Sequence, residues 1–505
     1  MTVAPVSIIG FASTDFVPGF VGETILGAGP ATSGNAVFKL LLVGNMLATG
    51  SKVPNQDTVQ VFSENDARLF FGPGSELHRM VRAALRVPGV AIWCSPVTQS
   101  IGAAATLTVT FATTATSAGT FTYWVDGERV DVPVALGDTP TIAGNTLVTQ
   151  LGTKDWFPVT PVNASGVVTL TRKQLGPRGN FGAVCQDATQ GPGGMTSALG
   201  GTGTAVTGGG KRFGGGTTAD DLTLVSTNVF PAWYQRVALA HIDSANLGVW
   251  AASENLKAGP LEGRPEHTVV ASNDTLANTQ SLSQTTLNNG RFEMVWMLES
   301  ESHPSELAAF VAALRVATEV SDPGAAYDDA VLIGVAPSRF PAQIPQRSTR
   351  LAALQTGVTP VYTVNGQALI VRAVTTRCLN GTAPDYRVLD TGWSSCADYI
   401  RVDIGSTVWP AFRAANPVNA DDPAPEQADR PSGVGTPKRF NDNLTKRLRQ
   451  FERGEAVPSG IPQIINVDSN LPSSGWDPVA KRIMALSPVV VAPRTHQVGV
   501  SVQQI

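Results

Sequence analysis

The chain has few charged side chains for its length. Only 15% of its 505 residues are charged, against about a quarter in a typical soluble domain. Lys and Arg (36) nearly balance Asp and Glu (40), so the net charge of −4 gives no electrostatic argument for a nucleic-acid partner. No apolar run is long enough for a transmembrane helix, and we expect no membrane insertion.

Residues that commonly build catalytic or metal centres are also scarce and scattered. The four cysteines form no Cys-x-x-Cys pair, which favours buried, reduced thiols, and the five histidines show no His-Glu-x-x-His spacing. His241-Ile242-Asp243 suggests an acid–base pair, but we favour Asp243 as the cap of a following helix. We therefore expect no catalytic site, no cofactor and no metal. The first twenty residues show no secretion signal.

Glycine and proline are abundant, and the length predicts two to four domains. The clearest element begins at Ser75, a good helix N-cap, with Glu76 at the positive end of the helix dipole. Apolar residues then recur at helical spacing until Pro88-Gly89, and the apolar run 90–94 follows as a buried strand. This stretch predicts one helix–strand unit of an α/β core.

Strand and helix patterns alternate on both sides of residues 98–216, which predicts a discontinuous α/β core domain. Its two parts are residues 31–97 and 217–349. Ser63 is expected to cap a short helix that closes at Gly72, and Ser302-His303-Pro304 to cap a longer one. Short buried strands are predicted at 38–44, 237–240, 268–271, 292–297 and 330–335.

Between the two core segments the composition changes to Thr, Val, Ala and Gly. Asp126-Gly127 signals a hairpin turn, and a helix is predicted from Thr139-Pro140 to Leu151. We interpret residues 98–190 as an inserted β-rich domain, with strands predicted at 107–111, 120–125, 129–134 and 167–171. Residues 191–216 hold twelve glycines but lack the Gly-Lys-Ser/Thr of a phosphate-binding loop, and they predict a flexible linker.

Residues 350–488 predict a C-terminal α+β domain. Asn365-Gly366 signals a type I′ hairpin, and residues 441–453 predict a helix with Leu444, Leu448 and Phe451 on one face. The fold class is thus a multidomain α/β and α+β protein with an extended arm at each end, residues 1–30 and 489–505. In the last arm Val498, Val500 and Val502 alternate with Gly or polar residues, which predicts a strand that joins a sheet of its own chain or of a neighbour.

Several motifs in this order resemble the sheath proteins of Mu-like contractile phage tails. Phe71-Gly72-Pro73-Gly74-Ser75 and its helix are similar to the family's N-terminal core. Three further stretches are similar to its C-terminal domain: Gly357-Val358-Thr359-Pro360 with the hairpin, Ile370-Val371-Arg372 with Thr375-Thr376, and Asp385-Tyr386-Arg387. Asp398-Tyr399-Ile400-Arg401 matches the family's next landmark, a helix start. No single motif is specific, but their order spans residues 351–505 almost completely.

The resemblance implies a structural subunit of a virion that is assembled in the host cytoplasm. Copies would form a helical homo-oligomer around a tail tube protein, with baseplate and tail terminator proteins as further partners. Contraction would drive the tube through the host envelope, and neighbours would be linked by exchange of terminal strands, here Val498, Val500 and Val502. We expect Lys446, Arg447 and Arg449 to contact the tube, although a solvated helix face explains them equally well.

Two other classes of protein remain as hypotheses. An α/β hydrolase or nucleotide-binding enzyme would form a small soluble oligomer with a ligand pocket at the strand C-termini, but the expected motifs are absent. A surface adhesin with a β-rich display domain would need a secretion signal, and that signal is missing.

Overall fold

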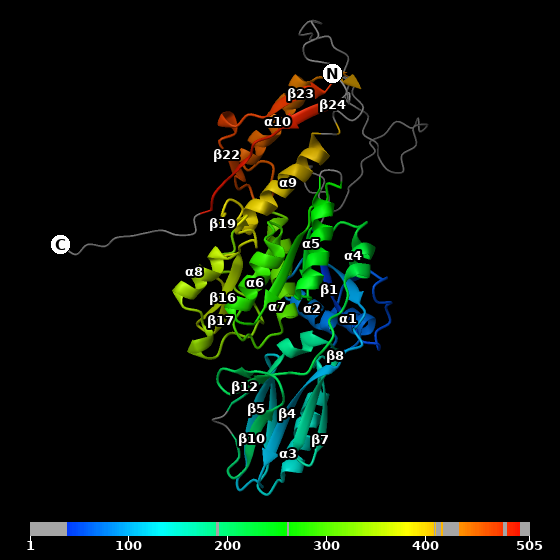
Figure 1. Cartoon of the computed structure of the whole chain (residues 1–505), viewed down its shortest axis with the longest axis vertical. Helices are drawn as coiled ribbons and strands as arrows, with labels where there is room; N and C mark the ends of the chain where they lie inside the picture. Colours follow the sequence, from blue (N-terminus) through cyan, green and yellow to red (C-terminus); the bar gives the residue numbers. More distant parts are fainter. Residues whose placement is uncertain are drawn as a thin grey trace, which may run out of the picture.

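The computed structural model describes residues 38–187, 191–259, 262–408, 410, 416–417, 434–477 and 482–494. The predicted arm 1–30 and the predicted strand at Val498, Val500 and Val502 lie outside these residues. Figure 1 shows three parts along the long axis: a β-rich part at one end, a sheet flanked by helices in the middle, and a part with two long helices and short strands at the other end. Within the described residues, no helix is both long and apolar enough to cross a bilayer.

The middle part contains an eight-stranded sheet of order β17-β16-β15-β14-β13-β1-β3-β2. Neighbouring strands are parallel, except that the outermost strands β17 and β2 pair antiparallel. The chain leaves the sheet after β3 and returns at β13, so the core is discontinuous in sequence. The strands are β1 (Lys39–Asn45), β2 (Val59–Val61), β3 (Ala91–Val97), β13 (Arg236–Leu239), β14 (His267–Ser272), β15 (Phe292–Trp296), β16 (Val358–Val364) and β17 (Gln367–Ile370).

Helices cover both faces of this sheet. Leu40 and Leu42 of β1 belong to one apolar cluster, and Leu41 and Val43 belong to another, because successive side chains of a strand point to opposite faces. Ser63 and Ser75 cap their helices as predicted, with their hydroxyls accepting from the Asp66 and His78 amides. The helices are α1 (Glu64–Phe71), α2 (Glu76–Ala84), α4 (Thr223–Val229), α5 (Ser244–Ala258), α6 (Leu276–Ser281), α7 (Pro304–Glu319) and α8 (Arg347–Gln355).

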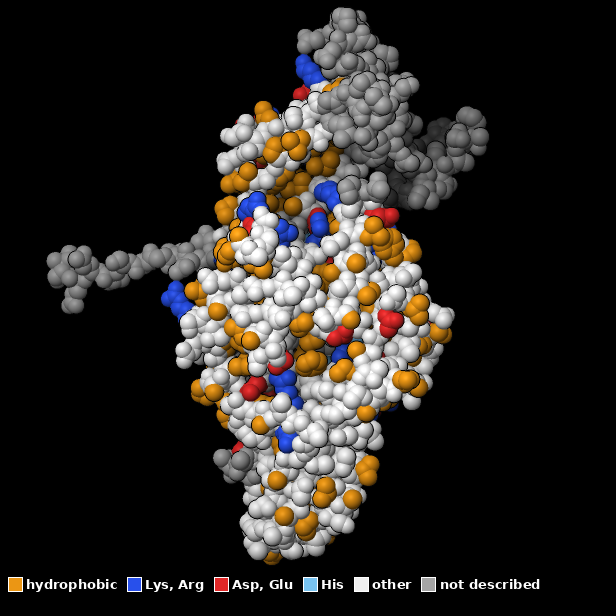
Figure 2. Space-filling model, viewed as in Figure 1, with side chains coloured by type: hydrophobic (Ala, Val, Ile, Leu, Met, Phe, Trp, Pro, Cys, Tyr) orange, Lys and Arg blue, Asp and Glu red, His pale blue; other side chains and the backbone are white. Residues whose placement is uncertain are grey.

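The β-rich part, here called the insert, consists of two antiparallel sheets and one helix. The strand orders are β10-β4-β8-β7 and β11-β12-β9-β5-β6. Figure 2 shows almost no charged side chains over the far half of the insert. The elements are β4 (Ala104–Ala112), β5 (Gly119–Val125), β6 (Glu128–Val134), α3 (Pro140–Gly152), β7 (Val159–Ala164), β8 (Val167–Leu175), η1 (Pro177–Phe181), β9 (Ala183–Gln186), β10 (Thr196–Gly200), β11 (Ala205–Val206) and β12 (Gly210–Arg212).

The prediction of a flexible linker at residues 191–216 is wrong. The segment contributes β10, β11 and β12 to the two sheets of the insert. Gly201 and Gly208 lie in the connections between these strands and have positive φ values of 115° and 84°. A Cβ at Gly208 would lie 2.0 Å from the Phe340 ring. Glycine is needed here for backbone conformation and close packing.

Two further predictions about the core are corrected. Residues 330–335 form no strand, and only Val331 makes an isolated bridge, to Leu369. The core also continues past residue 349, because β16 pairs with β15 and extends the sheet. The predicted Asn365-Gly366 hairpin then adds β17. Residues 329–332 cover the outer edge of β17 through backbone hydrogen bonds, but turns at 328–329 and 333–334 keep the segment from forming a regular strand.

The third part packs α9 and α10 around a small apolar cluster that includes Ile400, Leu444 and Phe451. The predicted helix at 441–453 is confirmed but begins earlier, with Thr436 as its cap. The predicted helix start at Asp398 instead lies in the middle of α9, and Val490–Val491 of the predicted arm pairs with β22 of its own chain. The elements are β18 (Leu379–Asn380), β19 (Ala383–Pro384), α9 (Thr391–Thr407), β20 (Asn416–Pro417), β21 (Val434–Gly435), α10 (Pro437–Glu452), β22 (Ile464–Ile465), β23 (Ser473–Asp477), β24 (Arg482–Leu486) and β25 (Val490–Val491).

Candidate functional site: buried charge clusters and the basic helix

The tip of the β5–β6 hairpin is buried against the middle part of the molecule. Asp126 occupies this turn with a φ of 48°, and its side chain has no exposed surface. Its Oδ2 accepts a hydrogen bond from Arg172 Nη1 of β8 at 2.6 Å and another from Arg79 of α2. Its Oδ1 accepts from the Ala183 amide at 3.1 Å. Arg79 also pairs with Glu306 of α7, so this carboxylate ties the insert to two helices of the core.

A second ion pair lies on the same boundary. Arg178 of η1 pairs with Glu76, and the same carboxylate oxygen of Glu76 accepts from the Asn45 amide at 3.1 Å. Arg178 also lies 3.3 Å from Asp220, which in turn contacts His241 Nε2 at 3.2 Å. We call this whole group the insert joint; its charged members are Glu76, Arg79, Asp126, Arg172, Arg178, Asp220 and Glu306.

Asp126 and Asp220 of the insert joint keep their charges at neutral pH, whereas burial raises the pKa of Glu306. Burial alone would raise the pKa of Asp126, but the guanidinium groups of Arg172 and Arg79 outweigh burial and hold it below its usual range. Asp220 behaves in the same way: burial is opposed by His241 and Arg178, and its pKa falls to about 2. Removing one partner of such a buried pair leaves an uncompensated charge in the interior. The insert is therefore held in one position on the core.

A comparable cluster, the α9 joint, lies between α9 and the central sheet. Arg315 reaches from α7 to Glu293 at 3.1 Å and Glu319 at 2.7 Å, and it donates to Ser395 of α9 at 2.9 Å. Arg236 of β13 donates to the same hydroxyl at 3.0 Å and pairs with Glu319. Two buried arginines of the core therefore meet on one side chain of the third part.

Asp398 makes the other link of the α9 joint. Arg291 donates to both of its carboxylate oxygens at 2.7 and 2.8 Å, and His267 Nε2 lies 3.1 Å away. Burial lowers the pKa of His267 to about 3, so its imidazole is neutral at neutral pH. Further along α9, Arg401 donates to the carbonyls of Ala258 and Gly259. These contacts fix α9 against β14 and α5.

The three predicted tube-contact residues lie in different environments: Arg447 is nearly buried, whereas Lys446 and Arg449 line a surface groove. Arg447 donates to both carboxylate oxygens of Asp403 at 2.7 Å, and its side chain is only 12% exposed, so it joins α10 to α9. Lys446 and Arg449 line a polar groove of about 540 Å³ on α10, together with Arg453. Arg449 pairs there with the exposed Asp468 at 2.7 Å. A surface contact is thus compatible with Lys446 and Arg449 but not with Arg447.

The suspected acid–base pair does not form in the structure. His241 contacts Asp220, whereas Asp243 caps α5 by accepting from the Asn246 amide, as we favoured. All four cysteines are buried and unpaired, as predicted. Within the described ranges, no group of three or more His, Cys, Asp or Glu side chains is placed to hold a metal ion.

The sequence does not predict the contacts that form either joint. Asp126-Gly127 predicts only a turn, because the local pattern specifies the backbone and not what the turn packs against. Arg79 and Arg172 are 93 positions apart in sequence (172 minus 79), yet they meet on one carboxylate. One feature of the sequence does point to buried ion pairs. Few residues are charged, and several of the arginines fall within otherwise apolar elements.

Comparison with known proteins gives one extended sequence match. The chain is 25% identical over 437 residues to the Mu-like prophage FluMu tail sheath protein of Haemophilus influenzae, and the match covers 84% of each protein. This match confirms the resemblance that the motifs predicted. No protein-family model matches the chain.

Two solved structures are similar over nearly the whole chain. The sheath tail protein of Listeria innocua is 12% identical with a TM-score of 0.48, and the alignment covers 91% of this chain and 93% of that one. The sheath tail protein of Desulfitobacterium hafniense is 14% identical with a TM-score of 0.46, covering 95% and 100%.

Proposed function

We propose that this chain, as a member of the Mu-like phage tail sheath proteins, forms a helical sheath around a tail tube and contracts to drive the tube through a host envelope. It is a structural subunit and not an enzyme. The observation that carries the proposal is the sequence match, which runs through most of the chain. The tube protein, the baseplate and the tail terminator are its proposed partners, and assembly takes place in the host cytoplasm.

The two charge clusters suggest how a subunit behaves during contraction. Contraction requires two packings of one subunit in the lattice, with free energy released between them. Both joints contain buried ion pairs such as Arg172–Asp126 and Arg315–Glu293, which are costly to open one partner at a time. We therefore expect the insert, the core and α9 to move together. The structural change on contraction would then occur at the contacts between subunits and in the terminal arms.

Strand exchange at the C-terminus is the proposed link between subunits. β23 and β24 form a two-stranded sheet whose outer edges pair with nothing in the described part of the chain. A sheet of two strands is marginal alone, and unpaired edges accept further strands. The alternating strand around Val500 in a neighbouring copy has the composition to join such an edge.

Negative-stain electron microscopy of the purified chain tests the proposal. We expect the full chain to form tubes or rings, and deletion of residues 495–505, which retains β25, to abolish them or shorten them severely. Val500→Pro should act like the deletion because proline removes a backbone donor, whereas Val500→Thr should assemble normally. Tubes of normal length from the deleted chain would contradict strand exchange. Discrete particles from the full chain, even with tail tube present, would contradict the sheath function.

The groove on α10 is the proposed contact with the tube. Lys446→Glu with Arg449→Glu should weaken binding to tail tubes by at least about tenfold at low salt and much less at high salt, because exposed charges are screened. Co-sedimentation with purified tubes measures this. The matched control is Arg68→Glu with Arg129→Glu, which makes the same charge change at two exposed positions elsewhere. Equal binding by the two double variants would contradict the assignment.

A further inference from the structure

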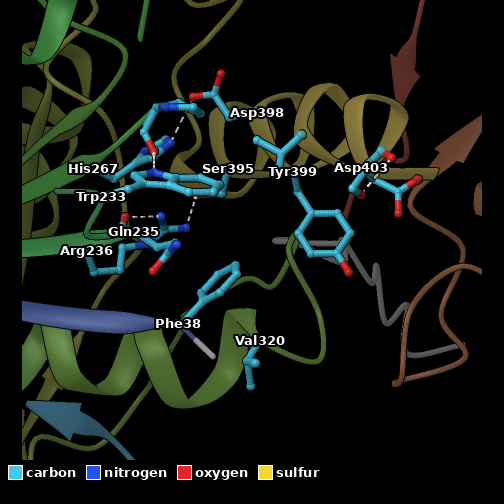
Figure 3. A pocket seen from close by; sticks show the side chains of 13 residues that line it. Phe38, Trp233, Gln235, Arg236, His267, Val320, Ser395, Asp398, Tyr399 and Asp403 are labelled. Atoms are coloured by element: carbon cyan, nitrogen blue, oxygen red, sulfur yellow. Dashed lines mark hydrogen bonds and ion pairs between the residues drawn. The ribbon is translucent and has the colours of Figure 1, made fainter. Parts of the chain in front are cut away.

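A cavity lies at the α9 joint, between α9 and the edge of the core (Figure 3). Its volume is about 60 Å³. Since one water needs about 10–15 Å³ of such space, the cavity has room for about four waters, or for the ring of one side chain. Phe38, Trp233, Val320, Tyr399 and Val402 form its apolar wall. The size and the wall fit an aromatic side chain better than a larger ligand.

Most polar groups around the cavity already have partners, although Nε of Arg236 has none. Arg236 donates to the Gln235 carbonyl and to Ser395, His267 contacts Asp398, and Asp403 accepts from Arg447. Figure 3 shows the contact between Arg236 and Ser395 and the contact between His267 and Asp398 as dashed lines. A charged ligand would have to displace these pairs, whereas an apolar side chain leaves them intact. The guanidinium of Arg236 also lies 5.6 Å from the Phe38 ring, so an aromatic group is already accommodated beside it.

The chain itself carries suitable side chains close to this cavity. The described structure begins at Phe38, which is part of the cavity wall, so the segment 1–37 must depart from there. That segment contains Phe11, Phe16 and Phe20 and no lysine or arginine. A random coil of 18 residues, the separation between Phe20 and Phe38, spans about 23 Å on average. Tethering at this length corresponds to an effective concentration on the order of millimolar.

We propose that Phe20 of the chain's own N-terminal segment occupies this cavity in the free subunit. Seated there, the side chain covers apolar surface of α9 and the core and holds the segment on its own subunit. If neighbours exchange arms in the sheath, a consequence that rests on the proposed function, the segment must leave the cavity before it can reach another copy. The cavity would then limit assembly of free subunits.

Disulfide trapping in the full chain tests whether Phe20 occupies the cavity, and it does not require the chain to assemble. Val21→Cys is combined with Ser406→Cys on the cavity wall, or with Ala397→Cys, an exposed position of α9 that does not line the cavity. Dilute protein is treated with copper phenanthroline, and products are separated on non-reducing gels. We expect the Ser406 pair to close an intrachain disulfide at least about tenfold faster than the Ala397 pair. The four native cysteines are buried and present in every variant, so the parent chain measures the background rate of disulfide formation.

Two added substitutions identify the side chain that is bound. Phe20→Ala should slow the Ser406 disulfide about tenfold, whereas Phe11→Ala should leave its rate unchanged. Equal rates for Ser406 and Ala397, or no effect of Phe20→Ala, would overturn the proposal. A product that appears only as dimers, in proportion to concentration, would also overturn it, because the occupant would then be the segment of another copy. None of these outcomes depends on whether tubes form.

Discussion

Asp126→Asn is expected to lower the free energy of unfolding by about 3–5 kcal/mol, the cost found when one partner of a buried ion pair is removed. Asparagine keeps the shape of the side chain but removes the charge that faces Arg79 and Arg172, whose side chains are 5% and 2% exposed. Two guanidinium groups would then be buried against one remaining carboxylate, that of Glu306. Urea or guanidinium denaturation of the purified chain measures the change.

Asp131→Asn is the matched control for this experiment. Asp131 lies on the neighbouring strand β6, but its side chain is 45% exposed and its arginine partner, Arg129, is 62% exposed. Exposed pairs contribute at most about 1 kcal/mol, so this variant should unfold nearly as the parent does. If both variants lose the same small amount, Asp126 does not hold the insert to the core in the way that the geometry implies.

His303→Asn is expected to make the chain less sensitive to acid. His303 is buried at the N-cap of α7, and burial together with Arg172 lowers its pKa to about 4 against an unperturbed value near 6.5. The unfolded chain therefore takes up a proton at this residue between pH 6.5 and 4 that the folded chain does not. Since the folded-state pKa is lowered, the stabilisation from this group is present above pH 6.5 and is lost as the pH falls towards 4.

The expected difference is about 2 kcal/mol. Between pH 7 and pH 5 the parent should lose that much more unfolding free energy than His303→Asn, because asparagine does not titrate. Asparagine also retains a capping oxygen for the first turn of α7. The carboxylates of the joints are common to both proteins, and the titration of those that His303 does not influence cancels in the comparison; His303 itself contributes to lowering the pKa of Asp126 and Glu76. Parallel loss of stability in the two proteins would show that His303 becomes protonated in the folded state.

Elements whose signals are local were predicted well. Ser63 and Ser75 cap helices because a hydroxyl beside free backbone amides satisfies them wherever the helix lies. Asn365-Gly366 forms its hairpin because both residues adopt positive φ, 50° and 74°, at little cost. The run 330–335 failed for the opposite reason: its backbone does hydrogen-bond to the edge of β17, but turns at 328–329 and 333–334 limit the contact to one bridge, and apolar composition does not reveal those turns.

Caps, turns, strand periodicity and the order of family motifs are properties of neighbouring residues, so they were available from the amino-acid order alone. They led to the discontinuous core, to the β-rich insert and to the sheath resemblance. Only the tertiary structure decided that Asp126 is buried between two arginines, that Arg447 is bound to Asp403, and that a cavity opens beside Phe38. Each of these depends on residues far apart in sequence being brought within a few ångströms. No local pattern specifies which distant residue will contact a charged side chain or complete the apolar lining of a cavity.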